Sequence, residues 1–178
     1  LDALKPRVEA IKVGDPKSAD TKVGTLISEA EAIRVEKSIA AAVSEGATLL
    51  TGGARTGAIV KPAIVCGVNP KSAFAQDELF GPAIAVSSTT GITDAIAIAN
   101  DSPYGLGAGV FTKNMDNSIQ AARELDAGSI HINWTPLWRA DLMPYGGLKS
   151  SGIGKEGVRS TVNEMTEEKT IILHGRSW

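Results

Sequence analysis

Short apolar runs alternate with helical patterns along most of this chain of 178 residues. The clearest helix is predicted from Ser28 to Gly46, because Ser28 and Glu31 match a capping box and Gly46 suits the residue after a helix. Strands are predicted over residues 47–50, 84–87, 107–112 and 129–133. This alternation predicts an α/β fold with a largely parallel sheet flanked by helices.

Four further segments complete the predicted fold. Residues 59–65 read as a strand interrupted by Pro62, which favours an edge or bulged strand. Helices are expected over 94–100, with Ile96 and Ala99 on one face, over 116–126, with Ile119, Ala122 and Leu125, and over 158–165. A last strand over 169–174 would present an open edge to a partner.

Composition excludes several classes of protein. Hydrophobic residues make up 43% of the chain and charged residues 21%, as in an ordinary globular protein. A net charge of −2 without a basic run argues against nucleic-acid binding, and no apolar run is long enough to cross a membrane. A single Cys suits a reducing compartment, so a cytoplasmic location is expected. Leu1 opens what reads as the tail of a helix, which suggests a fragment.

The hexapeptide at 77–82 (Asp-Glu-Leu-Phe-Gly-Pro) combines an acid and an aromatic ring with a strong backbone break at Gly81-Pro82. The Glu78 carboxylate can accept two hydrogen bonds from a vicinal diol such as a ribose, and Phe80 offers a flat apolar face. The competing interpretation is a solvated acid beside a core Phe.

Asn133 ends a predicted strand, and ligands of α/β sheets bind beyond the carboxyl ends of strands. The loop that follows, residues 134–145, is therefore a candidate site. Its Arg139 either grips an anionic substrate group bidentately or pairs with Asp141 on the surface. Trp134, Trp138 and Tyr145 lie close enough in sequence to exclude water from such a site.

Other motifs are weak. Gly152, Gly154 and Gly157 match the dinucleotide fingerprint formally, but no strand precedes them and no acid ends a following strand. His131 and His174 fall within predicted strands without ligand-like neighbours, so no metal site is predicted. Cys66 ends an apolar strand and is expected to be a buried, inert thiol.

Four ordered segments resemble the C-terminal part of an aldehyde dehydrogenase of the NAD(P)-dependent superfamily. They are Val-Gly-Asp-Pro at 13–16, the hexapeptide at 77–82, Asn-Asp-Ser-Pro-Tyr-Gly-Leu at 100–106 and Pro-Tyr-Gly-Gly-Leu-Lys-Ser-Ser-Gly at 144–152. The resemblance implies a catalytic domain over 1–165 that lacks its first segment, followed by an oligomerisation strand and tail over 166–178.

The resemblance also implies roles for particular residues. Glu78 corresponds to the acid that binds the nicotinamide ribose of NAD or NADP, and Phe80 to the ring near the nicotinamide. Tyr145 corresponds to an aromatic of the aldehyde tunnel, and Asn133 to the Asn beside the site. With Trp138 and Arg139 these form the expected substrate-binding set. The 169–174 strand corresponds to one that pairs with a neighbouring subunit in a homodimer or homotetramer.

The family's catalytic Cys, general-base Glu, oxyanion Asn and cofactor-binding domain lie upstream of these motifs, so no catalytic residue is assigned here. In the intact enzyme the resemblance implies thiolate attack on the aldehyde, hydride transfer to the nicotinamide and hydrolysis of the resulting thioester. The chain alone is expected to be inactive. The sequence around Arg139 is similar to subfamilies that oxidise lactaldehyde, or glyceraldehyde-3-phosphate without phosphorylation, which favours a small anionic or hydroxylated aldehyde.

Two other hypotheses remain open. The chain without its nucleophile is a non-catalytic module that only self-associates, or it derives from an acyl-phosphate reductase of the same fold. The intact run from Glu78 to Pro82 favours the oxidising branch over the reductase.

Overall fold

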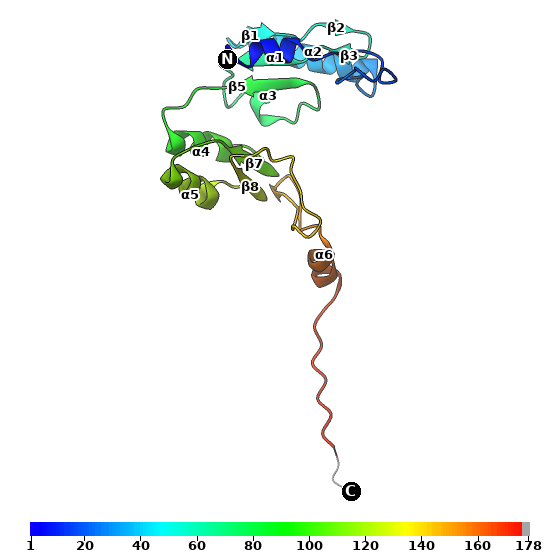
Figure 1. Cartoon of the computed structure of the whole chain (residues 1–178), viewed down its shortest axis with the longest axis vertical. Helices are drawn as coiled ribbons and strands as arrows, with labels where there is room; N and C mark the ends of the chain where they lie inside the picture. Colours follow the sequence, from blue (N-terminus) through cyan, green and yellow to red (C-terminus); the bar gives the residue numbers. More distant parts are fainter. Residues whose placement is uncertain (176–178) are drawn as a thin grey trace. The chain divides into compact units, whose positions relative to one another are not determined.

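The computed structural model describes residues 1–175, and internal contacts divide the chain into two compact units. Unit 1 is Leu1–Gly91 and unit 2 is Ile92–Trp178. Each unit contains both helices and strands, which confirms the α/β class (Figure 1). The predicted boundary between residues 165 and 166 is a separate proposal about function and stays a prediction.

Unit 1 is built around a small mixed sheet. Its elements, in chain order, are α1 (Lys5–Glu9), α2 (Glu29–Ser44), β1 (Thr48–Thr51), β2 (Arg55–Thr56), β3 (Ile59–Val60), β4 (Ala63–Cys66), α3 (Ala73–Gln76) and β5 (Ala83–Val86). The sheet has the order β1-β4-β5, with β1 antiparallel and β5 parallel to the central β4. β2 and β3 form a separate antiparallel hairpin.

The core of unit 1 lies between α2 and the sheet. Ala32, Val35, Ile39 and Ala42 on one face of α2 pack with Val60, Ala63 and Val65, and Leu79 packs against the edge of this cluster. Ile64 is also fully buried, and strand alternation places it on the opposite face of β4. α1 contacts β1 and β4, so the central strand is covered on both sides.

The predicted long helix is confirmed as α2. Ser28 is the N-cap, and its hydroxyl accepts a 3.2 Å hydrogen bond from the Glu31 N–H, the interaction expected of a cap. Gly46 follows the helix with a φ of +103°, a conformation that a residue with a Cβ rarely adopts. Both ends of the helix are therefore set by local sequence.

The prediction for residues 59–65 was wrong in one respect. Pro62 does not make an edge strand; it separates β3 from β4, and β4 is the central strand of its sheet. Pro62 lacks an N–H, so the ladder begins one residue later, at Ala63. An irregularity in register does occur further along β4, where Leu49 and Thr51 of β1 pair with Val65 and Ile64.

The described part of unit 2, residues 92–175, contains two short sheets and three helices. Its elements are α4 (Ile92–Asn100), β6 (Tyr104–Gly105), β7 (Gly107–Val110), α5 (Met115–Glu124), β8 (Ser129–Ile132), β9 (Leu148–Lys149) and α6 (Val158–Met165). β7 and β8 are parallel and in register from Gly107–Ser129 to Val110–Ile132, whereas β6 and β9 are antiparallel. α4 contacts α5, and α5 contacts β8 (Figure 1).

The helices of unit 2 begin and end near the predicted residues, but their inward faces differ. Ile96 is buried on α4 as expected, whereas Ala99 is exposed. On α5 the buried residue is Ala121, while Ile119 and Ala122 are exposed. α5 begins after Asn114, whose side chain accepts hydrogen bonds from the N–H groups of Asp116 and Asn117.

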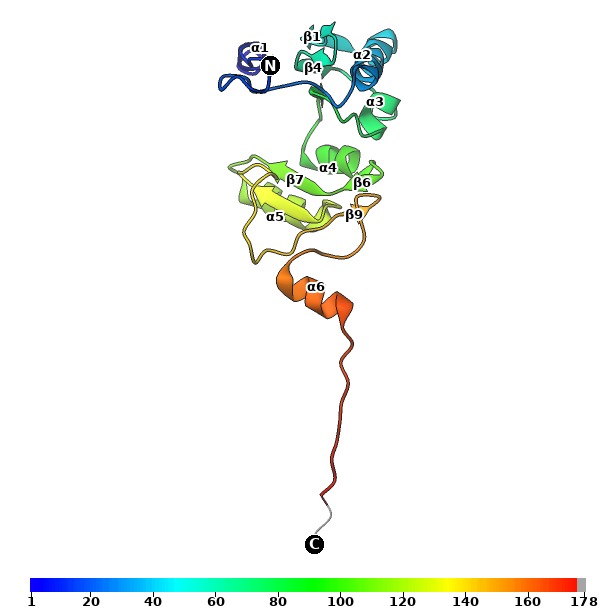
Figure 2. The ribbon, with the colours of Figure 1, turned by 90° about the vertical axis from the view of Figure 1, so that its right-hand side faces the viewer.

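The strand predicted over residues 169–174 does not form in the single chain. Residues 166–175 carry no regular secondary structure and are exposed (Figure 2). An extended segment becomes a strand only when a neighbouring backbone pairs with it, and residues 1–175 offer no such neighbour. Residues 176–178 of the predicted tail lie outside the described residues.

Residues 1–175 include no helix with the length and apolar character needed to span a membrane. No group of three or more His, Cys, Asp or Glu side chains in that range is arranged to hold a metal ion. Cys66, at the end of β4, is a half-buried free thiol.

Candidate functional site

In unit 1, the 77–82 loop is fixed at its end by the sheet. It begins directly after α3 and leads into β5. The Pro82 carbonyl accepts a hydrogen bond from the Ala63 N–H at 2.8 Å, and the Gly81 carbonyl accepts one from the Ala83 N–H at 2.8 Å. These bonds tie the loop to the central strand and to the start of β5.

Helix α2 fixes the middle of the same loop. The Nη2 atom of Arg34 donates a 2.6 Å hydrogen bond to the Leu79 carbonyl, and the Leu79 side chain packs against the core. Gly81 lies directly on Val35, because a Cβ at position 81 would come within 2.6 Å of a Val35 methyl carbon. Only glycine permits this approach.

Phe80 adopts a left-handed backbone conformation, with a φ of +46°. Such a conformation is a genuine outlier for a bulky residue. Phe80 is 74% exposed, so the interpretation of Phe80 as a core residue is wrong. Its conformation therefore gains little from burial and is held by the surrounding loop, a pattern that is frequent at ligand sites.

Glu78 and Phe80 stand close together on this stiff loop, and both are exposed. Within residues 1–175, no hydrogen bond or ion pair to the Glu78 carboxylate is observed. A carboxylate with available oxygens and an unburied flat ring fit the ribose diol and the ring of a nicotinamide nucleoside.

In unit 2, Asn133 joins the ends of β7 and β8. It has a φ of +56°, its N–H donates to the Val110 carbonyl at 2.7 Å, and its side-chain oxygen accepts from the Thr112 N–H at 2.8 Å. Asn is one of the residues that tolerates the left-handed region. Within residues 1–175 the side-chain amide nitrogen of Asn133 has no hydrogen-bond partner, so it is available to a ligand.

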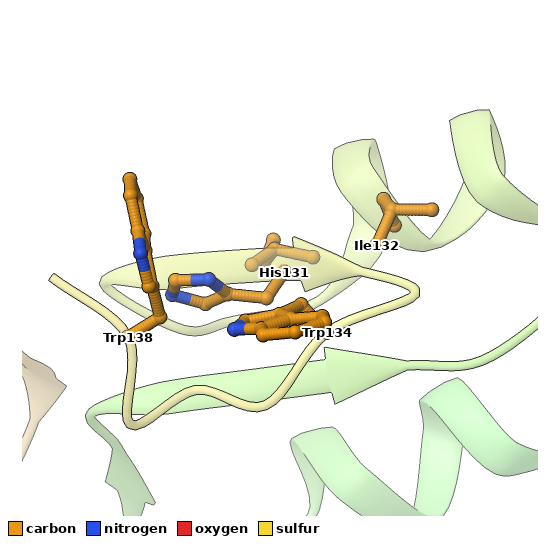
Figure 3. Close-up of a pocket in the computed structure, with 5 residues that line it drawn as sticks. His131, Ile132, Trp134 and Trp138 are labelled. Atoms are coloured by element: carbon orange, nitrogen blue, oxygen red, sulfur yellow. The ribbon is translucent and has the colours of Figure 1, made fainter.

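Three rings gather on one side of β8. His131, Trp134 and Trp138 lie together (Figure 3). The His131 and Trp138 rings meet edge to face, with centroids 6.3 Å apart. These rings, with Ile130 and Ile132, line a cavity of about 380 Å³. Nε2 of His131 is buried there without a hydrogen-bond partner in residues 1–175.

Arg139 does not pair with Asp141 as the surface interpretation expected. Its Cζ atom stacks 3.6 Å from the centre of the Tyr145 ring, and its Nη2 atom lies 3.6 Å from the Glu156 carboxylate. The Tyr145 N–H donates to the Glu156 carbonyl at 3.0 Å, so the ring and the carboxylate come from paired segments. The Arg139 side chain is still 48% exposed and can reach an anion in solvent.

The structure thus groups the predicted residues by unit. Glu78 and Phe80 share one loop of unit 1, and Arg139 contacts Tyr145 in unit 2. Sequence analysis missed the contributions of Arg34 and Glu156. Each reads in sequence as an ordinary surface charge, and no local signal indicates its distant partner.

Comparison with known proteins identifies the family to which this chain is similar. The model of the aldehyde dehydrogenase family matches residues 1–171. A 3-sulfolactaldehyde dehydrogenase of Priestia aryabhattai is 42% identical over 174 residues, which are 98% of this chain and 36% of that protein. A lactaldehyde dehydrogenase of Methanococcus maripaludis is 42% identical over 162 residues, 91% of this chain and 35% of that protein.

A solved structure supports the same family. The glyceraldehyde-3-phosphate dehydrogenase GapN of Methanocaldococcus jannaschii, complexed with NADP, superposes with a TM-score of 0.90 at 38% identity. The match covers 97% of this chain and 37% of that one. The chain therefore spans about a third of the length of the relatives it matches, and it belongs to the aldehyde dehydrogenase family.

Proposed function

We propose that this chain is the part of an NAD(P)-dependent aldehyde dehydrogenase that holds the nicotinamide ribose and the tail of the aldehyde. The observation that carries the proposal is the 77–82 loop, which keeps an exposed Phe80 in a left-handed conformation beside an exposed carboxylate. A fold maintains such strain only where the surrounding structure enforces it.

The cofactor would be held by Glu78 and Phe80. The ionised carboxylate accepts hydrogen bonds from the two ribose hydroxyls, and the ring packs against the nicotinamide end. A bound NAD or NADP supplies the hydride acceptor of the reaction. The chain's own residues orient that acceptor. They do not supply the nucleophile, because the half-buried Cys66 ends a strand away from this loop.

The substrate would be a small anionic or hydroxylated aldehyde. Arg139 supplies a guanidinium that can bind a carboxylate, sulfonate or phosphate. The Tyr145 ring stacks on this guanidinium and orients its plane. Trp138 would line the approach with apolar surface, and the Asn133 amide nitrogen would donate to the substrate. The names of the relatives support this class, since they include lactaldehyde, 3-sulfolactaldehyde and glyceraldehyde-3-phosphate dehydrogenases.

Self-association is the partner proposal. Residues 169–174 would pair with a neighbouring subunit of a homodimer or homotetramer, in the cytoplasm. The support is chemical: Ile171, Ile172 and Leu173 are all exposed in the single chain, although they form a consecutive apolar run. A purely self-associating module would still form the oligomer through residues 169–174, but it would neither bind the cofactor nor oxidise an aldehyde.

The test is aldehyde-dependent formation of NADH or NADPH by the whole gene product that contains this chain. We expect turnover with lactaldehyde-like or acid-bearing aldehydes, and none by the purified 178-residue chain. Oxidation by this chain alone that disappears in Cys66→Ala would contradict the assignment. Failure of the whole gene product to bind NAD or NADP, with retained self-association, would favour the non-catalytic module.

A further inference from the structure

Two arginines of unit 1 link helix α2 to the backbone of a neighbouring loop. Arg34, on α2, bonds Glu31 through Nε at 2.8 Å and the Leu79 carbonyl through Nη2 at 2.6 Å. Arg55, on β2, bonds the α2 residues Glu36 and Glu29 and the Gly57 carbonyl, each at 2.9 Å. The chemistry of the two networks is alike, but only that of Arg34 reaches the 77–82 loop.

The carbonyl that Arg34 holds belongs to the peptide between Leu79 and Phe80. This peptide plane turns about the N–Cα bond of Phe80, and the angle of that turn is the φ of Phe80. A donor that fixes the carbonyl direction therefore also fixes the left-handed conformation of the ring-bearing residue. Arg34 therefore restrains the torsion angle, the φ of Phe80, that differs from the values usual for a bulky residue.

The shape of the guanidinium suits this task. Its planar fork has fixed angles between donors, so the bond from Nε to Glu31 sets the direction in which Nη2 points. The next helix residue, Val35, contacts Gly81 at close range. Two consecutive residues of α2 thus hold the peptides before and after Phe80, one by a hydrogen bond and one by packing.

We propose that Arg34 is a positioning residue for cofactor binding: it locks the Leu79–Phe80 peptide so that Glu78 and the Phe80 ring face the nicotinamide ribose together. This inference rests on the proposed function of Glu78 and Phe80. Arg34 itself touches neither substrate nor cofactor in the proposal. Its effect passes through the loop backbone.

The experiment compares Arg34→Met with Arg55→Met in the whole gene product. Methionine keeps an unbranched apolar stem and the helix propensity of the side chain while removing every donor. The affinity for NAD⁺ and NADP⁺ is measured by calorimetry without aldehyde, and stability is measured as the thermal unfolding midpoint. Hydrogen exchange of a peptide covering residues 77–82 reports on the loop directly.

The two variants should show opposite patterns. Arg34→Met should raise the cofactor Kd by about tenfold, the loss expected for one charge-assisted hydrogen bond, and should speed exchange in the loop. Arg55 is more buried than Arg34 and bonds two carboxylates, so Arg55→Met should lower the unfolding midpoint more. It should leave the cofactor Kd within about twofold of the parent. Arg34→Lys, which keeps a charged donor but loses the planar fork, should recover part of the affinity.

Three outcomes overturn the inference. An unchanged Kd in Arg34→Met, or an equal loss of affinity in Arg55→Met, would mean that Arg34 only supports the fold. An Arg34→Lys variant as weak as Arg34→Met, without faster loop exchange in either, would have the same meaning. Glu78→Gln distinguishes failure of the Arg34 inference from failure of the proposed cofactor site. If Glu78→Gln weakens cofactor binding and Arg34→Met does not, only the Arg34 inference is contradicted. If Glu78→Gln also leaves Kd unchanged, the proposed cofactor site fails with it.

Discussion

The 77–82 loop and the 134–147 loop (the residues between Asn133 and β9) are built in different ways. The first is bonded to α2 and β4 and packed against the core at Leu79 and Gly81. The second places its main candidates, Trp138 and Arg139, half exposed and held by ring contacts and a long ion pair. The difference matches the roles proposed for the two loops: the nicotinamide ribose is the same in every reaction cycle and suits a rigid loop, whereas a looser loop can adapt to different aldehydes.

The most severe test of the rigid loop is Gly81→Ala. The added Cβ would meet the methyl carbons of Val35, which is fully buried and cannot move aside. Overpacking of this kind costs about 3 kcal/mol at the upper end of its range. We expect thermal unfolding of unit 1 to shift down by several degrees. Gly91→Ala is the matched control, since a Cβ there meets nothing within 4 Å, and it should leave stability unchanged.

Stability equal to that of the parent in Gly81→Ala would show that the loop yields to a methyl group. The contrast between the two loops would then disappear.

Glu78→Gln tests what the rigid loop is for. The amide keeps the shape of the side chain but replaces an ionised acceptor, so affinity for NAD or NADP should fall by about 1.5–3 kcal/mol. Hydride transfer in single-turnover experiments should slow, because the nicotinamide is held less firmly. Stability should stay within error, since Glu78 is exposed. Asp77→Asn, the neighbouring exposed acid, serves as the control; equal losses in both variants would point to a general charge effect.

Arg139→Leu tests the looser loop. KM for a phosphorylated or carboxylated aldehyde should rise about tenfold, the lower end of the range for a charge-assisted contact, because the guanidinium is half exposed. A neutral aldehyde of similar size should lose little, since it has no charge to pair. Steady-state kinetics on the two aldehydes decide the matter. A loss of similar size on both would mean that Arg139 supports the loop and does not read the substrate.

Glu156→Gln should have the smallest effect. Its carboxylate lies 3.6 Å from Arg139 and is 74% exposed, so the pair is weak. Removing the negative charge should lower KM for an anionic aldehyde by about twofold, because Glu156 competes with the substrate for the same guanidinium. Glu164→Gln is the comparison, since Glu164 accepts its hydrogen bond from the Lys155 N–H. A rise in KM for the anion in Glu156→Gln would mean that Glu156 orients Arg139 and does not compete with the substrate.

Sequence reasoning succeeded where the cause of a structure is local. The cap at Ser28 and the glycine at position 46 set the two ends of α2 from within a few residues, and both were readable. It failed where the cause is distant. Pro62 could not reveal that β4 is central, because the order of strands depends on pairings far along the chain. The 169–174 segment could not become a strand without a second backbone beside it.

In the candidate site, too, features with a local cause were predictable and features with a distant cause were not. The backbone break at Gly81-Pro82 correctly indicated a stiff loop carrying Glu78 and Phe80. The left-handed Phe80 was not predictable, because Phe is among the residues least expected there. Arg34 lies 45 residues from Leu79, and Arg139 turned to Glu156 in place of its sequence neighbour Asp141. Such pairs become visible only when the chain is folded.

The conformation of Asn133 bears on any effort to redesign this protein for a new aldehyde. Its backbone and side-chain bonds both set where the parallel strands end, and its φ of +56° excludes β-branched and bulky replacements. A mutagenesis library should therefore hold position 133 constant and randomise positions 138 and 139, whose side chains are half exposed. Under the proposed function, variants recovered from such a library would differ in the aldehyde they select while sharing an undisturbed scaffold.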